Sequence, residues 1–129
     1  MLAVDTNLIV RYLIGDHHQQ AAKARAVIDS KDVFVSTTVM LETEWVLRSV
    51  YGFTPTQVCA ALRGFAGLTR VSLEDPGLVA TALDRMAHGL DFADALHFGR
   101  ADDCDAFVTF DRQFIKAART AGLKTVRVP

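Results

Sequence analysis

The chain has 129 residues, enough for one domain with a hydrophobic core of its own. Half of the residues are apolar, and 15 acidic against 14 basic residues leave a net charge of −1, so the uniform basicity of many nucleic-acid binders is missing. No run approaches the roughly 20 apolar residues of a membrane span, and Met1 leads into residues 2–4 without the basic segment of a signal peptide. We therefore expect a soluble, cytoplasmic protein.

Two further features of the composition bear on partners and compartment. Cys59 and Cys104 are isolated in helical patterns, which predicts two buried free thiols rather than a disulfide. The neutral balance of charge leaves a nucleic-acid partner open, because acids gathered around a metal ion would offset surrounding arginines in the sum.

The first half of the chain begins as strand, acid, helix. A short apolar strand stops at Asp5, and a helical pattern then runs to the turn at Gly15-Asp16. Thr54, Pro55 and Gln57 combine a capping box with proline at the first helical position, the clearest helix start in the sequence. The expected elements are a strand at 2–4, helices at 8–14 and 17–28, a strand at 33–36, a helix from a cap at Thr37 or Thr38 to Tyr51, and a helix at 55–66.

The second half continues the alternation. The expected elements are a short strand at 70–73, a helix from Asp75-Pro76 to His88-Gly89, a helix capped by Asp91, a strand at 106–110, a helix at 112–121 and a strand at 125–128. Strands that alternate with helices predict an α/β protein whose parallel sheet is covered by helices on both faces.

Four acids share one kind of position along this pattern: Asp5, Glu42, Asp94 and Asp111. Each lies at or near the carboxyl end of a strand or the amino end of a helix, and in a doubly wound sheet these ends fall along one edge. Carboxylates that share a cleft repel one another, and a divalent cation removes that conflict. Ligands that are all oxygen favour Mg²⁺ or Mn²⁺ over zinc. Such a site suits phosphodiester hydrolysis by metal-activated water.

Helix capping is the alternative explanation for several acids. Asp5 precedes Thr6-Asn7 in the manner of a helix N-cap, and Asp91 has the stronger claim to be only a cap. Asp94 follows Asp91 at the capping-box distance, but its short side chain reaches back poorly.

Glu42 and Glu44 lie on different sides of their helix, since two residues turn it by about 200°. Glu42 lies on the same mostly apolar helix face as Val39 and Val46. Because a charged side chain is costly on such a face, its presence there indicates a functional role. Glu44 stands four residues before Arg48, which predicts a surface ion pair.

Other polar and aromatic residues have plainer interpretations. His97 is expected to support the site by hydrogen bonding rather than to bind metal, and the acids at 102, 103 and 105 are expected to be solvated. Trp45, Leu41 and Tyr51 are expected in the core or at a dimer face, with base stacking as the alternative for the aromatic rings.

Four motifs together resemble the PIN-domain ribonucleases, especially the VapC-type toxins of bacterial toxin-antitoxin pairs. They are Val4-Asp5-Thr6-Asn7, Ser36 followed six residues later by Glu42, Asp94-Ala95-Leu96, and Val108-Thr109-Phe110-Asp111. The resemblance covers essentially the whole chain. It implies a single PIN-like domain over residues 1–129 with about five parallel strands in the order 3-2-1-4-5.

The resemblance also implies an activity and its partners. These are endoribonuclease cleavage of RNA dependent on Mg²⁺ or Mn²⁺, a homodimer, inhibition by a cognate antitoxin, and contact with operator DNA only through the antitoxin complex. The metal-binding acids carried over from the family are Asp5, Glu42 and Asp94, with Asp111 in a fourth, more variable position. The residues that would orient them by hydrogen bonding are Thr6, Asn7 and Thr109. Asp91 would share or replace part of the role of Asp94.

Two other functional classes are compatible with an α/β chain of this length. An aspartyl-phosphate phosphotransferase or phosphatase of the haloacid-dehalogenase kind needs a second Asp where Asn7 stands, and a receiver domain needs a lysine near a last strand that has none at 125–128. A catalytically silent PIN-like binding module is disfavoured because all four acids are present.

Overall fold

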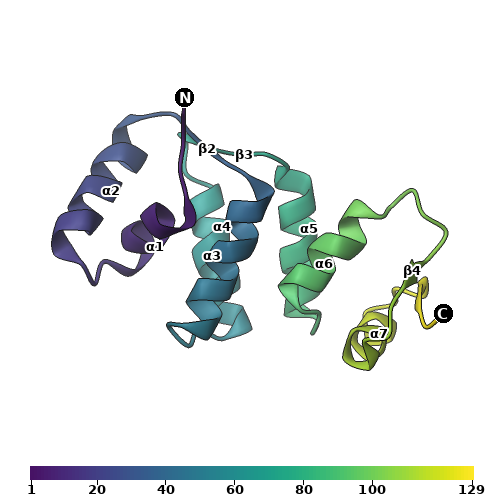
Figure 1. Cartoon of the computed structure of the whole chain (residues 1–129). Helices are drawn as coiled ribbons and strands as arrows, with labels where there is room; N and C mark the ends of the chain where they lie inside the picture. Colours follow the sequence, from purple (N-terminus) through teal and green to yellow (C-terminus); the bar gives the residue numbers. More distant parts are fainter. The chain divides into compact units, whose positions relative to one another are not determined.

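The computed structural model describes all residues from Met1 to Pro129. It divides into two compact units, Met1–Pro76 and Gly77–Pro129. Figure 1 shows the helices and strands of both units.

The first unit contains three strands and four helices, at nearly the positions that the sequence predicts. They are β1 (Leu2–Ala3), α1 (Thr6–Ile14), α2 (His18–Ser30), β2 (Val33–Val35), α3 (Thr37–Ser49), α4 (Pro55–Ala66) and β3 (Val71–Leu73). The capping box at α4 is confirmed, because the Gln57 N–H donates to Thr54 Oγ1 at 3.2 Å and the Thr54 N–H donates to Gln57 Oε1 at 2.9 Å. At the end of α1, Gly15 adopts the left-handed conformation (φ 73°), which costs glycine little because it has no Cβ.

The sheet of the first unit is parallel, with β2 between β1 and β3. Val33 is the register partner of both Leu2 and Val71. The carboxyl ends of the three strands therefore meet at one edge, where Asp5, Ser36 and Glu74 follow β1, β2 and β3. A hydrogen bond of 2.8 Å from the Thr37 N–H to Glu74 Oε1 joins the ends of β2 and β3 directly.

The second unit consists of α5 (Pro76–Ala87, whose first residue ends the first unit), α6 (Phe92–Arg100), β4 (Phe107–Val108), α7 (Arg112–Thr120) and β5 (Val126–Arg127). β4 and β5 pair in parallel, with Phe107 opposite Val126. The order of the first three strands and the pairing of the last two are those expected. The adjacency of β1 and β4, which would complete the order 3-2-1-4-5, stays a prediction.

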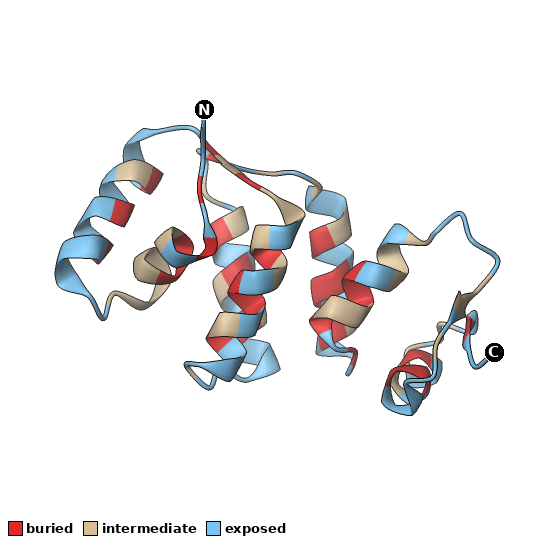
Figure 2. Cartoon of the chain, viewed as in Figure 1, coloured by how far each residue is buried: buried red, intermediate tan, exposed pale blue.

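In the first unit the core lies between the helices and the sheet. The buried residues of α2 are Ala21, Ala24 and Ile28. Figure 2 shows the buried part of α2 on the side toward α1. In α4, Phe65 is 1% exposed and packs edge-to-face against Tyr12, with ring centroids 6.0 Å apart. Because buried residues recur at helical spacing, the packing of one apolar face stabilises each of these segments as a helix.

Two expectations about burial are wrong, and both concern the cysteines. Neither cysteine forms a disulfide, as expected, but Cys59 is only half-buried. Cys104 is exposed, because α6 ends at Arg100 and Cys104 lies in the following turn. Of the two places expected for Trp45, the core is excluded, because the side chain is 53% exposed and α3 buries the face that carries Met40 and Leu47. The dimer face stays a prediction.

None of the helices combines the length and apolarity that a membrane crossing requires.

Candidate functional site

The four predicted site acids divide between the two units. Asp5 and Glu42 belong to the first, and Asp94 and Asp111 belong to the second.

Asp5 is the N-cap of α1, as the alternative explanation predicts. Its extended backbone (φ −99°) ends the approach from β1, and its Oδ1 accepts a hydrogen bond of 3.0 Å from the Leu8 N–H. The cap uses one carboxylate oxygen and fixes the orientation of the other, Oδ2. Asp5 is exposed, so that second oxygen can meet a ligand.

The two residues after Asp5 differ in environment. Thr6 is 7% exposed, and its hydroxyl oxygen is buried without a hydrogen-bond partner. Asn7 is exposed and lines the same cavity as Asp5. The role of both residues in orienting a metal ligand stays a prediction.

Glu42 and Glu44 lie on different sides of α3, as expected, but their environments differ from the prediction. Glu42 is exposed, whereas Glu44 is only 1% exposed. Glu44 does pair with Arg48, whose Nε lies 2.9 Å from Glu44 Oε2, but the pair is not a surface bridge on the glutamate side. The reason is spacing: Glu44 lies four residues after Met40 and three before Leu47, so it shares their buried stripe. The expected apolar setting of Glu42 is correspondingly wrong.

Asp91 and Asp94 begin α6 together. Asp91 is its N-cap, and Asp91 Oδ2 accepts a hydrogen bond of 3.2 Å from the Asp94 N–H. Asp94 lies in the first turn, near the positive end of the helix dipole. The Asp94 carboxylate accepts no hydrogen bond within the protein, whereas the N-cap carboxylates of Asp91 and Asp111 do.

Asp111 is the N-cap of α7. Its Oδ1 accepts hydrogen bonds from the N–H groups of Gln113 (3.0 Å) and Phe114 (3.1 Å), and Oδ2 is left for other ligands. Thr109 accepts a hydrogen bond of 3.0 Å from the Asp111 N–H. Thr109 therefore positions Asp111 through its backbone rather than through the carboxylate.

The three acids of the second unit line one cavity of about 360 Å³, together with Gln113. Burial is the main cause that raises the pKa of Asp94 above its ordinary value of 3.8, and the charges of Asp91 and Asp111 raise it further. The charge of His97 acts in the opposite direction. Asp94 is thus a carboxylate held among other negative charges, without a hydrogen bond that would stabilise its ionised form.

The donor chemistry of this cavity fits a hard divalent cation in part. Mg²⁺ takes one or two protein carboxylates and completes its shell with waters and phosphate oxygens, and Asp94 with Asp111 can supply two carboxylates. No group of three or more Asp, Glu, His or Cys side chains is arranged to hold a metal ion by itself. His97 is exposed on α6. Its expected role, support of the site by hydrogen bonding rather than metal binding, stays a prediction.

Two polar residues near these sites, Gln113 and Glu74, were not selected by the sequence analysis. Gln113 lines the cavity of the second unit, and its place in the first turn after the Asp111 cap is the signal that points to it. Glu74 accepts a hydrogen bond from the Thr37 N–H at the start of α3, a helix whose N-cap is Ser36. It directly follows a strand, the same position that singled out Asp5 and Asp111.

Asp5 and Asp111 each follow a parallel strand and cap the helix after it. This arrangement is typical of α/β proteins whose ligands bind at the carboxyl ends of strands. A family model described as PIN domain matches residues 2–120, and the chain belongs to the PIN-domain family. Members of this family are generally metal-dependent nucleases, so the chain is a hydrolase of the nucleic-acid-cleaving type. Among curated proteins, none matches the sequence.

Proposed function

We propose that the protein is an endoribonuclease in which Asp5, Glu42, Asp94 and Asp111 bind one or two Mg²⁺ or Mn²⁺ ions. The observation that carries the proposal is the setting of Asp94. Its pKa is raised by burial and by Asp91 and Asp111, and no hydrogen bond relieves the repulsion. A divalent cation would relieve it, and such ions are general in the PIN-domain family.

The chain's own residues would prepare this site before a metal binds. Asp5 and Asp111 each give one oxygen to a helix cap, which holds the second oxygen in a fixed direction. Asp91 holds the start of α6 and adds negative charge beside Asp94. When bound, the divalent cation supplies an activated water and stabilises the leaving oxygen of the phosphodiester. For this chemistry the two units must bring their acids together as one PIN domain over residues 1–129.

We further propose that the nuclease is the toxin of a toxin-antitoxin pair. The four motifs that resemble VapC-type toxins support this role. Cys59 and Cys104 form no disulfide, which together with an RNA substrate supports action in the cytoplasm. The exposed side chains of Trp45 and Val50, at 53% and 63%, support a protein contact along α3, as in a homodimer.

The test is RNA cleavage by the purified chain. We expect cleavage of single-stranded RNA with Mg²⁺ or Mn²⁺, loss of cleavage with EDTA, and recovery when excess metal is added back. A DNA oligonucleotide of the same sequence is the control for RNA specificity. Cleavage that survives EDTA would contradict the metal mechanism. No cleavage, together with covalent labelling by acetyl phosphate, would favour an aspartyl-phosphate enzyme instead.

A further inference from the structure

A second cavity lies in the first unit, between α1 and α2. It has a volume of about 240 Å³. Leu8, Ala24 and Val27 provide apolar walls, and the polar lining residues are Asp5, Asn7, Arg11, Gln20 and Lys23. The volume is below the roughly 300–1,000 Å³ of pockets that enclose drug-sized ligands, so the cavity suits one small flat group.

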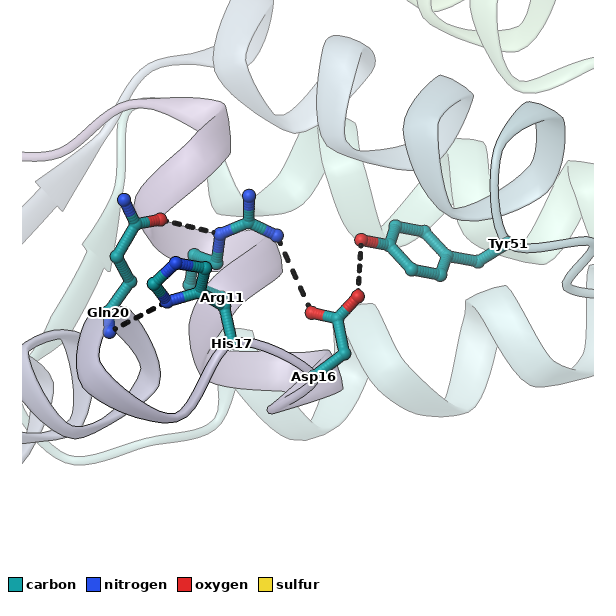
Figure 3. A network of polar contacts seen from close by, with 5 residues as sticks. All are labelled: Arg11, Asp16, His17, Gln20 and Tyr51. Atoms are coloured by element: carbon teal, nitrogen blue, oxygen red, sulfur yellow. Dashed lines mark hydrogen bonds and ion pairs between the residues drawn. The ribbon is translucent and has the colours of Figure 1, made fainter.

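Arg11 is held in place at the side of this cavity. Figure 3 shows its guanidinium between two partners: Nε donates to Gln20 Oε1 at 2.7 Å, and Nη1 lies 3.4 Å from Asp16 Oδ1. Tyr51 in turn donates its hydroxyl to Asp16 Oδ2 at 3.2 Å. These contacts fix the plane of the guanidinium and leave Nη2 without a protein partner. A pre-oriented donor of this kind loses little conformational entropy when it binds a ligand.

The remaining polar groups have the chemistry of base and phosphate recognition. Arginine and the amides of Asn and Gln are the side chains that read base edges, and Arg11 and Asn7 line the cavity with donors to spare. Lys23 adds a positive charge at the same cavity, which suits a phosphate. Asp5, proposed above as a metal ligand, lines it as well.

We propose that this cavity is a nucleotide subsite that takes the base of one unpaired nucleotide of the RNA substrate. Asn7 and Arg11 would contact the edge of the base, the apolar walls its face, and Lys23 the adjacent phosphate. Unpaired RNA bases are recognised in this way, by their edges and faces. The inference rests on the proposed function, because Asp5 lies beside the cleaved phosphate only if it is a metal ligand of the nuclease. It makes the cavity a determinant of which nucleotide flanks the cut.

A peptide or protein segment fits this cavity less well than a nucleotide. Helix-binding grooves are extended and lined by apolar anchors at several turns, whereas this cavity is small and its lining includes the polar side chains of Asn7, Arg11 and Lys23.

The test is titration of the ¹⁵N-labelled full chain with each of the four nucleoside 5′-monophosphates in EDTA, followed by NMR. We expect one nucleotide to shift the amide signals of Asn7, Ala24 and Val27 in a saturable way. Lys23→Gln should weaken that binding by roughly fivefold, as for the loss of one exposed ion pair. Arg25→Gln is the matched control, because it removes the same charge from α2 at an exposed residue outside the cavity. It should change binding less than twofold.

Arg11 needs a separate control, because it also joins α1 to the start of α2. Arg11→Gln should weaken nucleotide binding more than Asp16→Asn, which breaks the same ion pair from outside the cavity. Equal losses in these two variants would assign Arg11 a structural role and overturn its part in the subsite. Absence of shifts at the cavity amides, or equal effects of Lys23→Gln and Arg25→Gln, would overturn the subsite. Because this assay involves no cleavage, its outcome is independent of the nuclease test.

Discussion

Replacing Asp94 with asparagine should lower RNA cleavage at saturating Mg²⁺ by at least about 100-fold. Even residues that only orient metal ligands cost 10- to 100-fold when they are removed, and a direct ligand should cost no less. Asparagine keeps the shape of the side chain but loses the charge that holds the cation. The measurement is the initial rate of cleavage for the two proteins side by side. Asp102→Asn, the same chemical change in an exposed turn, is the control and should retain full activity.

The same variant should be more stable than the wild type when no metal is present. Because the folded state raises the pKa of Asp94, it binds this proton more tightly than the unfolded chain does. The wild type therefore loses stability as the pH rises from about 3.8 through the raised pKa. An asparagine side chain cannot ionise, so Asp94→Asn avoids that loss, and the difference should disappear as the pH falls toward 3.8. Urea denaturation in EDTA at several pH values measures it. A less stable variant at pH 7 would contradict the raised pKa and would weaken the case for a metal at this position.

Replacing Phe65 with alanine should lower the free energy of unfolding by about 3–5 kcal/mol. Phe65 is 1% exposed, and the substitution removes its edge-to-face contact with Tyr12 and leaves a cavity in the core of the first unit. The measurement is the shift of the urea midpoint at constant slope.

The matched control for Phe65 is the same substitution at an exposed phenylalanine. Phe110 is 85% exposed, so Phe110→Ala should change the free energy of unfolding by no more than about 0.5 kcal/mol. Similar losses in the two variants would show that burial of Phe65 does not carry the stability of the unit.

The helices and strands could be predicted closely because their signals are local. Thr54 with Gln57 starts α4, Gly15 ends α1, and Asp91 and Asp111 cap α6 and α7, each through bonds to residues two to four positions away. Such contacts depend only on neighbouring sequence, so they can be read without the fold. The acids that matter for the proposed site stand at these same caps.

The exposure of individual side chains could not be predicted in the same way. Helical spacing gives the angle between Glu42 and Glu44, but which of the two faces the core depends on what packs against α3. In the structure α3 packs against α1 and α4, and the face that carries Met40, Glu44 and Leu47 is the buried one. The exposure of Trp45 follows from the same packing of α3, and that of Cys104 from the end of α6 at Arg100.

The sequence by itself determined the family, the alternation of helices and strands, and the positions of Asp5, Glu42, Asp94 and Asp111 along it. Only the tertiary structure decided that Asp91, Asp94 and Asp111 share one cavity, and that Arg11 and Lys23 line another beside Asp5. The physical reason is the range of the interactions. Caps and periodicity act within a few residues, whereas burial, repulsion between charges and the shape of a cavity depend on segments that are far apart in the chain.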